Sequence, residues 1–265
     1  LIAMLSSENR YARYGACYAL RESGYGSQAA VARLIELMES SDDLDLRLNA
    51  IDALTAGDPK ISLAASAKSA IPSLLRLTVK RFEIDPRRLL QRQLASALFA
   101  RSGLITLHGI VDIDSDLLLP AIREILTADD GRARGLVSSI YPKLKPEDRE
   151  ALWPDIYRAT QGIAPSGIMF ADGIRASGLK LMEQHDVAEG VDLAIAFMLE
   201  DRWGKGRRQD AALEVLTAYG PAAKKALPHL KNLKTAKLNP EQLAQVESTI
   251  KALETGSARD LESIR

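Results

Sequence analysis

The chain has a single cysteine, few aromatic residues and no excess charge of either sign. Cys17 is the only cysteine among 265 residues, so neither an internal disulfide bond nor a cysteine metal cluster can form. Aromatic residues make up 5% of the chain, and Leu, Ala and Ile carry most of the apolar content, which favours thin layers of packed helices. Basic and acidic residues number 35 each, so the whole chain has no net attraction to nucleic acid or to an anionic membrane.

Sequence motifs for catalysis and cofactor binding are missing as well. There is no Gly-x-Ser-x-Gly elbow, no Gly-x-x-x-x-Gly-Lys phosphate loop and no Gly-x-Gly-x-x-Gly fingerprint. The three histidines form neither a His-Glu pair nor a His-x-x-x-His spacing. A weak metal site would need His108 to join Asp112 and Asp114, and an ordinary loop histidine is the favoured interpretation. Cys17 falls on an apolar helical stripe and is interpreted as a buried small side chain. We therefore expect no cofactor and no enzymatic activity.

No run of apolar residues approaches the length of a membrane-spanning helix. The chain opens on Leu1-Ile2-Ala3-Met4-Leu5, which is interpreted as the end of a helix in a truncated repeat. We therefore expect the chain to be part of a larger polypeptide. A targeting segment would then lie outside it, and a cytoplasmic location is only a default.

Arginine recurs at intervals of 34 to 45 residues along the chain. The series is Arg13, Arg47, Arg92, Arg134 and Arg208, with Ala171 in the place of a further member. A drifting period of about 40 residues is typical of repeat proteins. Such arginines could bind an acidic partner or could hold successive layers in register. The structural interpretation is favoured, because stacked layers demand the same residue at the same position.

A second marker, an apolar-Pro-x-apolar segment, alternates with the arginines. Its prolines are Pro72, Pro120, Pro154 and Pro228. With the 3.6-residue spacing of apolar side chains, the two markers predict paired helices. The first helices of the pairs are expected at 27–39, 66–81, 116–127, 147–160, 187–200 and 222–235. The second helices are expected at 8–23, 43–56, 87–102, 131–142, 169–184 and 205–219. A last helix over 240–253 would cap an array spanning 1–255, and 256–265 would be a frayed tail.

The repeat resembles the HEAT family. The resemblance rests on Asp-x-Arg-x-x-Ala-x-x-Ala-Leu starting at Asp45, on Arg-x-x-Ala-x-x-Ala-Leu starting at Arg13, and on the proline segments. It implies an all-α solenoid, a right-handed superhelix of about six helical hairpins whose surfaces bind other macromolecules. Two stretches interrupt the rhythm, 103–115 and 162–167. Such insertions map to loops that often bind partners, although packing onto a neighbouring layer is favoured for 103–115.

One segment, 201–237, has a local excess of basic charge, with nine basic residues against three acidic ones. A solvated helix face is the common reason for such a run. The candidate partner-binding residues are Arg202, Trp203, Lys205, Arg207, Arg208, His108, Asp112 and Asp114. Trp203 could stack on a peptide or on a base. The favoured hypothesis is therefore a non-enzymatic scaffold for a protein partner. The alternative is a nucleic-acid binder, since HEAT-like folds include DNA glycosylases with a basic concave face.

Overall fold

The computed structural model describes residues 1–23, 28–55, 67–100, 103–128, 137–162, 168–234 and 238–264. All regular elements within these ranges are helices, so the predicted all-α class is confirmed. The described residues divide into two compact units. The first contains residues up to 128 together with 139–150, and the second contains 137–138 and 151–264. Each unit is described separately below.

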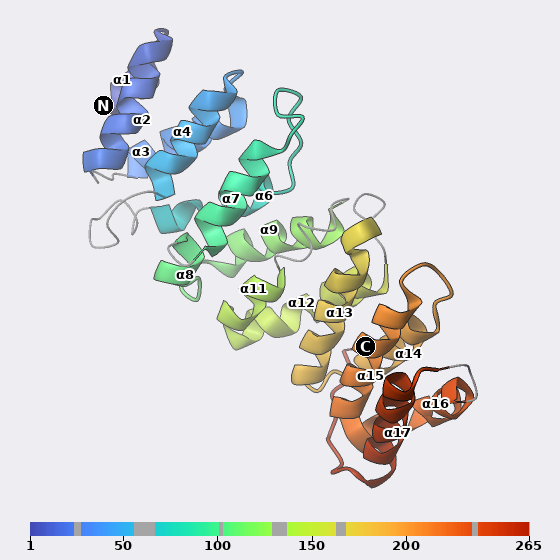
Figure 1. Cartoon of the computed structure of the whole chain (residues 1–265). Coiled ribbons are helices and arrows are strands. Elements are labelled where there is room, and N and C mark those ends of the chain that lie inside the picture. The colour runs from blue at the N-terminus through green and yellow to red at the C-terminus, as the bar shows by residue number, and fades with distance from the viewer. Residues whose placement is uncertain are drawn as a thin grey trace. The chain divides into compact units, whose positions relative to one another are not determined.

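The first unit is built from pairs of helices in two layers (Figure 1). Its main helices are α1 (Ile2–Leu5), α2 (Arg10–Ser23), α3 (Gln28–Ser40), α4 (Leu44–Thr55), α6 (Ile71–Leu77), α7 (Leu89–Phe99), α8 (Leu104–His108) and α9 (Ser115–Thr127), with a 3-10 turn η1 (Lys68–Ala70) before α6. In one layer α2 packs on α4 and α4 on α7, and in the other α3 packs on α6 and α6 on α9. Fully buried side chains such as Leu34, Ile51 and Leu74 fill the space between the layers.

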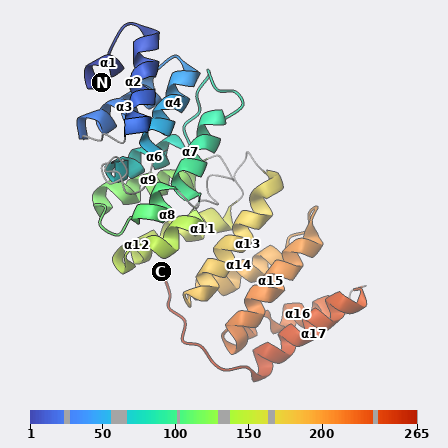
Figure 2. The same ribbon diagram turned by 60° about the vertical axis from the view of Figure 1, so that its left-hand side comes forward.

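The second unit repeats this arrangement. Its helices are α13 (Ile168–Gln184), α14 (Glu189–Leu199), α15 (Lys205–Tyr219), the 3-10 helix η3 (Gly220–Ala226), α16 (Leu227–Lys234) and α17 (Pro240–Thr255). The helices α13, α15 and α17 lie side by side in one layer, as Figures 1 and 2 both show, and α14 and η3 pack behind them. The short α11 (Val137–Ile140) and the helix α12 (Pro146–Gln161) have residues in both units, and the 3-10 turn η2 (Tyr141–Lys143) lies between them.

Several helices begin where short polar side chains accept hydrogen bonds from the first backbone N–H groups. Asp43 accepts from Leu46 N at 3.2 Å, and the buried Asp85 accepts from two amides at the start of α7, at 2.7 and 2.8 Å. Asn239 and Gln242 form a reciprocal capping box at the start of α17. At α4, α7 and α17 these caps help to place the observed helix starts within two residues of the predicted ones.

The insertion at 103–115 folds onto the first unit. Leu104, Ile105 and Ile110 are each 1–2% exposed, and α8 packs against α7 and η1. Packing of the inserted apolar side chains therefore accounts for this segment. The other predicted interruption, 162–167, lies outside the described residues except for Gly162.

Arg47 shows how a marker arginine is used. Its guanidinium donates to Met38 O at 2.9 Å and to Ser41 O at 2.5 Å, at the end of α3, and lies 4.1 Å from the centroid of the Phe82 ring. The side chain is 5% exposed. A cation at a helix C-terminus satisfies carbonyls that have no partner in the helix and stabilises the negative end of the helix dipole.

Other members of the series make related contacts with different burial. Arg13 donates to Ser7 O at 2.6 Å in the turn before its own helix. Arg92 donates to Arg87 O at 2.9 Å and is exposed. Arg134 lies outside the described residues. The carbonyls that accept these bonds belong to the turn that connects the two helices of a pair.

Arg208 is the most buried member, with no exposed surface. It donates to three carbonyls of the turn between α14 and α15, those of Glu200 at 3.1 Å, Arg202 at 2.7 Å and Trp203 at 2.7 Å. Its Nη1 also lies 3.0 Å from the Asp172 carboxylate. A single side chain thus holds the whole turn.

In the preceding helix pair, the sequence period predicts an arginine at position 171, which is Ala171. The arginine that makes the contact is Arg175, one helical turn later along α13. Arg175 is 5% exposed, donates to Thr160 O at the end of α12 at 2.9 Å, and pairs with Glu200 at 2.6 Å. Its guanidinium lies 4.8 Å from the centroid of the Phe197 ring, as that of Arg47 lies over Phe82. The apparent loss of the arginine at Ala171 is therefore a shift of four residues.

The proline markers take two kinds of position. Pro72 and Pro228 lie in the first turn of α6 and α16, where the missing N–H would have no partner in the helix. Pro120 and Pro154 lie inside α9 and α12. Proline therefore marks the first helix of a pair without marking its exact start.

The C-terminal residues 256–264, where the sequence predicts a frayed tail, make contacts with distant residues. Arg259 pairs with Glu183 and Asp186 at 2.5 and 2.7 Å and donates to Ala218 O at 2.9 Å. Glu262 N donates to Asp186 O at 2.8 Å, next to an isolated bridge between Glu262 and Val187. These partners lie more than 70 residues away in the sequence, except Ala218, so local composition gives no sign of them.

Cys17 is 1% exposed, and burial raises the pKa of its thiol to about 11, which keeps the thiol protonated at neutral pH. Within the described part of the chain, no helix combines the length and the apolar character that crossing a bilayer requires.

The difference in burial between Arg208 and Arg92 predicts a difference in stability. Arg208→Leu leaves three turn carbonyls without their buried donor, whereas Asp172 keeps Arg202, so we expect a loss of about 2–3 kcal/mol in the free energy of unfolding. Arg92→Leu removes contacts that water can replace, and we expect a change within about 0.5 kcal/mol. Urea unfolding of the two variants measures both values. Equal effects would contradict the role given to burial.

Candidate binding pocket between α13 and α15

The turn from Glu200 to Gly204 has an unusual orientation. Because its carbonyls point inward to Arg208, the side chain of Trp203 points outward and is 85% exposed. Gly204 adopts φ +86°, in the left-handed region that glycine reaches without strain, and its position directly precedes α15. The local sequence therefore combines a buried arginine, a left-handed glycine and a tryptophan that has no place in the core.

An ion-pair network lies behind this turn. Arg202 forms ion pairs with Asp172 and with Glu200, the latter at 2.8 Å. Glu200 forms a second ion pair with Arg175. Burial alone would raise the pKa of the Glu200 carboxyl, but hydrogen bonds from Arg202 and Arg175 outweigh it and hold that pKa below its usual value. The network therefore contributes its full stability above the ordinary glutamate pKa and loses it as the pH falls through the lowered one.

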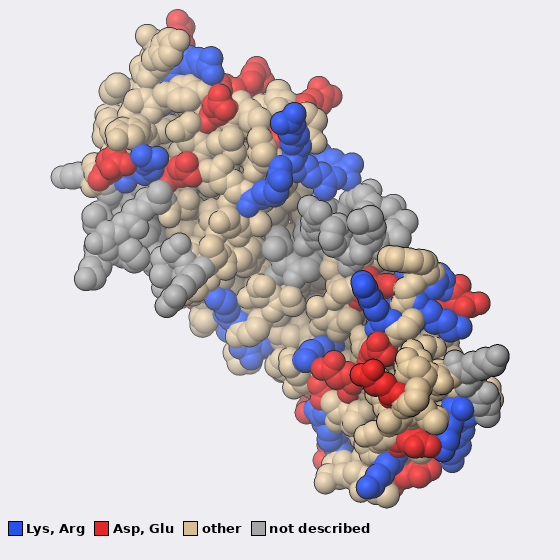
Figure 3. Space-filling view, viewed as in Figure 1, with Lys and Arg blue, Asp and Glu red and all other residues tan. Residues whose placement is uncertain are grey.

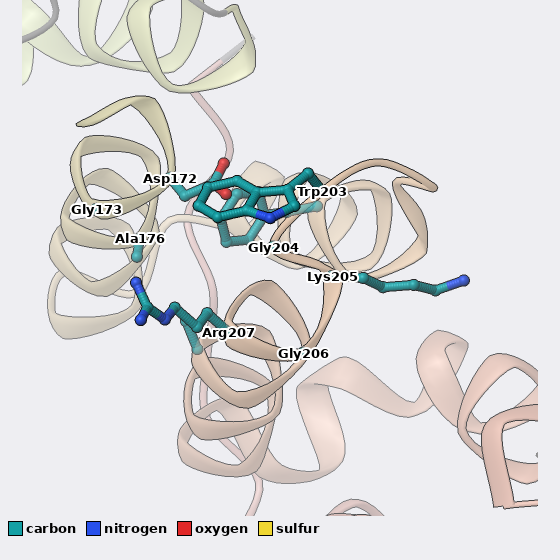
Figure 4. A pocket seen from close by; sticks show the side chains of 10 residues that line it. Asp172, Gly173, Ala176, Trp203, Gly204, Lys205, Gly206 and Arg207 are labelled. Atoms are coloured by element: carbon teal, nitrogen blue, oxygen red, sulfur yellow. The ribbon is translucent and has the colours of Figure 1, made fainter. Parts of the chain in front are cut away.

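A cavity of about 810 Å³ lies between α13 and the start of α15. Asp172, Gly173 and Ala176 line it from α13, and the segment 203–207 lines it from the other side. Figure 4 shows the indole of Trp203 extending from the start of α15 toward α13, and the guanidinium of Arg207 reaching toward Ala176. Lys205 points away from α13 in the same view and pairs with Asp201 at 3.0 Å. The cavity thus has an aromatic wall and one arginine directed across it.

Two helical glycines in the cavity wall have no steric reason within the fold. A Cβ built on Gly173 or on Gly206 would meet no atom within 4 Å. By contrast, a Cβ on Gly178, further along α13, would lie 2.2 Å from Thr160 Oγ1. Close packing explains Gly178, whereas Gly173 and Gly206 leave open space at the surface of the cavity.

The basic run at 201–237 is largely neutralised by acidic residues from other helices. Besides Arg202 and Lys205, ion pairs join Lys225 to Asp192 at 2.7 Å, Lys231 to Glu254 at 3.4 Å and Lys234 to Glu247 at 2.7 Å. On the visible face of the second unit, basic and acidic side chains are intermixed (Figure 3). Among the described residues, exposed Arg207 and Lys224 have no ion pair, and Lys237 is not described. The local excess of charge therefore does not become a broad positive surface.

The structure brings together part of the predicted set. Trp203, Lys205 and Arg207 line the cavity, whereas Arg202 is engaged in the network behind it. Arg208 is a correction: it is fully buried, so it supports the turn and presents no surface to a partner.

The candidate residues of the insertion lie elsewhere, in the first unit. Asp112 pairs with Lys68, and Asp114 accepts from Asp116 N at 2.9 Å as the cap of α9. The side chain of His108 lies outside the described residues. Within the described ranges, no cluster of three or more His, Cys, Asp or Glu side chains could hold a metal ion.

Sequence reasoning missed Asp172, Glu200, Arg175 and Gly173. Asp172 directly follows Ala171, the position that the arginine period singled out, so the region was marked although its chemistry was not. No local motif links Asp172 to Arg202 and Arg208, which lie 30 and 36 residues further on.

Comparisons with known proteins give no family for this chain. No family model matches the sequence, and no curated protein is found to be similar to it. Among solved structures, a crystal structure of an engineered protein from the Northeast Structural Genomics Consortium is 16% identical, with a TM-score of 0.31. That match covers 97% of this chain and 96% of the other. A TM-score this low supports no conclusion about fold or function.

The two glycines of α13 predict opposite effects of the same substitution. Gly173→Ala adds a methyl group in open space and improves helix propensity, so we expect a gain of about 0.5–1 kcal/mol in the free energy of unfolding. Gly178→Ala displaces the buried Thr160 hydroxyl, and we expect a loss. Chemical denaturation of both variants provides the measurement, and a loss at Gly173 as large as that at Gly178 would refute the open cavity.

Proposed function

We propose that this chain is a non-enzymatic interaction module of HEAT-like helical hairpins that binds a protein partner. The paired helices and the two layers within each unit support the repeat architecture. The arginines that bind connecting turns in successive pairs support it further, since repeated layers need repeated contacts.

The observation that carries the binding function is the exposure of Trp203 beside the cavity. An 85% exposed tryptophan buries little surface in its own fold. Tryptophan and arginine are the residues most enriched among the strongest contacts of protein interfaces, and both line this cavity. The ion pairs and the Arg208 hydrogen bonds hold the backbone of the turn that carries Trp203, so little backbone order has to be gained on binding.

Nucleic-acid binding is the weaker candidate. A nucleic-acid backbone presents a series of phosphates and needs several cations along its path. Three of the four described basic residues in and beside the turn, Arg202, Lys205 and Arg208, are already paired with carboxylates. The cavity therefore offers one available arginine rather than a basic track.

Site-specific photo-crosslinking tests the proposed function. A benzophenone amino acid in place of Trp203 is expected to form an adduct with a protein partner in extracts of the source cells. The same residue in place of Tyr11, 81% exposed in the first unit, is the control for exposure alone. A partner captured at 203 and not at 11 supports the proposal. No adduct at 203, or the same proteins at both positions, contradicts it.

A further inference from the structure

The charges that face the cavity leave one cation without a partner among the described residues. Asp172 is satisfied by Arg202 and Arg208, and Lys205 is turned away and paired with Asp201. Arg207 is exposed, reaches across the cavity toward α13 and has no carboxylate partner in the described ranges. An occupant that carries one negative group would complete this arrangement.

The apolar part of the cavity fits a side chain next to that negative group. The indole of Trp203 forms one wall, and the buried Phe197 is also part of the lining. Gly173 and Ala211 add small side chains to that lining and so leave room. Glycine within α13 lowers helix stability by roughly 0.5–1 kcal/mol relative to alanine, and among the described residues no atom lies within 4 Å of a Cβ built on Gly173. Gly173 and Trp203 line the same cavity, so this space is available to an apolar side chain that packs on the indole.

We propose that this pocket recognises an acidic peptide segment of the partner. One aspartate or glutamate carboxylate binds the Arg207 guanidinium, and a neighbouring aliphatic or aromatic side chain lies on Trp203 above Gly173. The fork of an arginine matches a carboxylate with two parallel hydrogen bonds. This inference rests on the proposed protein-binding function and adds the chemistry of the partner.

Charge complementarity favours a peptide over a nucleic acid here. A single unpaired guanidinium matches a single carboxylate, whereas the other cations beside the cavity, Arg202, Lys205 and Arg208, are paired with Asp172 or Asp201. Breaking these pairs would oppose the gain from each phosphate contact. The oligonucleotide arm of the experiment below tests this choice directly.

The experiment selects ligands with a phage-displayed library of random dodecapeptides on the full chain. We expect the enriched peptides to carry Asp or Glu beside an aliphatic or aromatic residue. The best peptide is then synthesised together with a matched peptide that has Asn or Gln in place of each acid. Binding is read from Trp203 fluorescence in a Trp153→Phe background, where Trp203 is the only tryptophan. Replacing the acid is expected to weaken binding about tenfold or more.

Three variants locate the peptide on the protein. Arg207→Gln should weaken binding of the acidic peptide about tenfold and leave binding of the amide peptide unchanged. Gly173→Leu should block both peptides by filling the cavity. Lys224→Gln, a second exposed basic residue without an ion pair in the described ranges, should change neither. Circular dichroism and thermal unfolding verify that the Gly173→Leu variant is folded.

Each outcome decides the proposal. Enriched peptides without acids, binding that survives both Arg207→Gln and Gly173→Leu, or no enrichment at all would overturn it. A ten-nucleotide oligothymidylate that binds through Arg207 more tightly than the peptides would make nucleic acid the occupant and would also overturn it. Peptides that bind elsewhere on the chain leave the protein-binding function standing. Acidic peptides that bind here while crosslinking at 203 captures no partner would instead overturn the proposed function.

Discussion

The buried guanidinium of Arg208 is the interaction on which the candidate site depends. It collects three backbone carbonyls of one turn and pairs with Asp172 from a neighbouring helix. The carbonyls of the turn face inward, and the side chain of Trp203 faces outward. Asp172 is paired with Arg208 and Arg202, so Arg207 on the cavity wall has no carboxylate partner among the described residues. One contact inside the fold therefore sets both the shape and the charge of the surface. Arg47 and Arg175 make related contacts with helix ends in other pairs.

Most of the helices could be predicted from the sequence, because apolar spacing and caps act over a few residues. The arginine predicted at position 171, which is Ala171, could not be assigned correctly to Arg175. The contact is set by where α12 ends, at Thr160 O, and a guanidinium four residues further along α13 reaches that end. A period counted on the sequence follows the repeat length, whereas the contact follows the end of the previous helix.

For a related reason, only the residues of the candidate site that are close in sequence could be predicted. Trp203, Lys205 and Arg207 lie within five residues of one another, so a local excess of basic and aromatic residues reveals them. Their partners come from other helices, and ion pairs such as Lys225–Asp192 turned a predicted basic face into a mixed one. The tail held by Arg259 was missed in the same way. Only the folded chain shows which charges remain available.

The most direct test of this account is acrylamide quenching of Trp203 fluorescence in a Trp153→Phe variant. If Arg208 holds the turn as described, quenching should approach that of free tryptophan, since the indole is 85% exposed. The emission should also shift to the blue when the pocket is occupied. Quenching as weak as that of a core indole, in the folded and unliganded chain, would contradict the account, because Trp203 would then belong to the core and not to a binding surface.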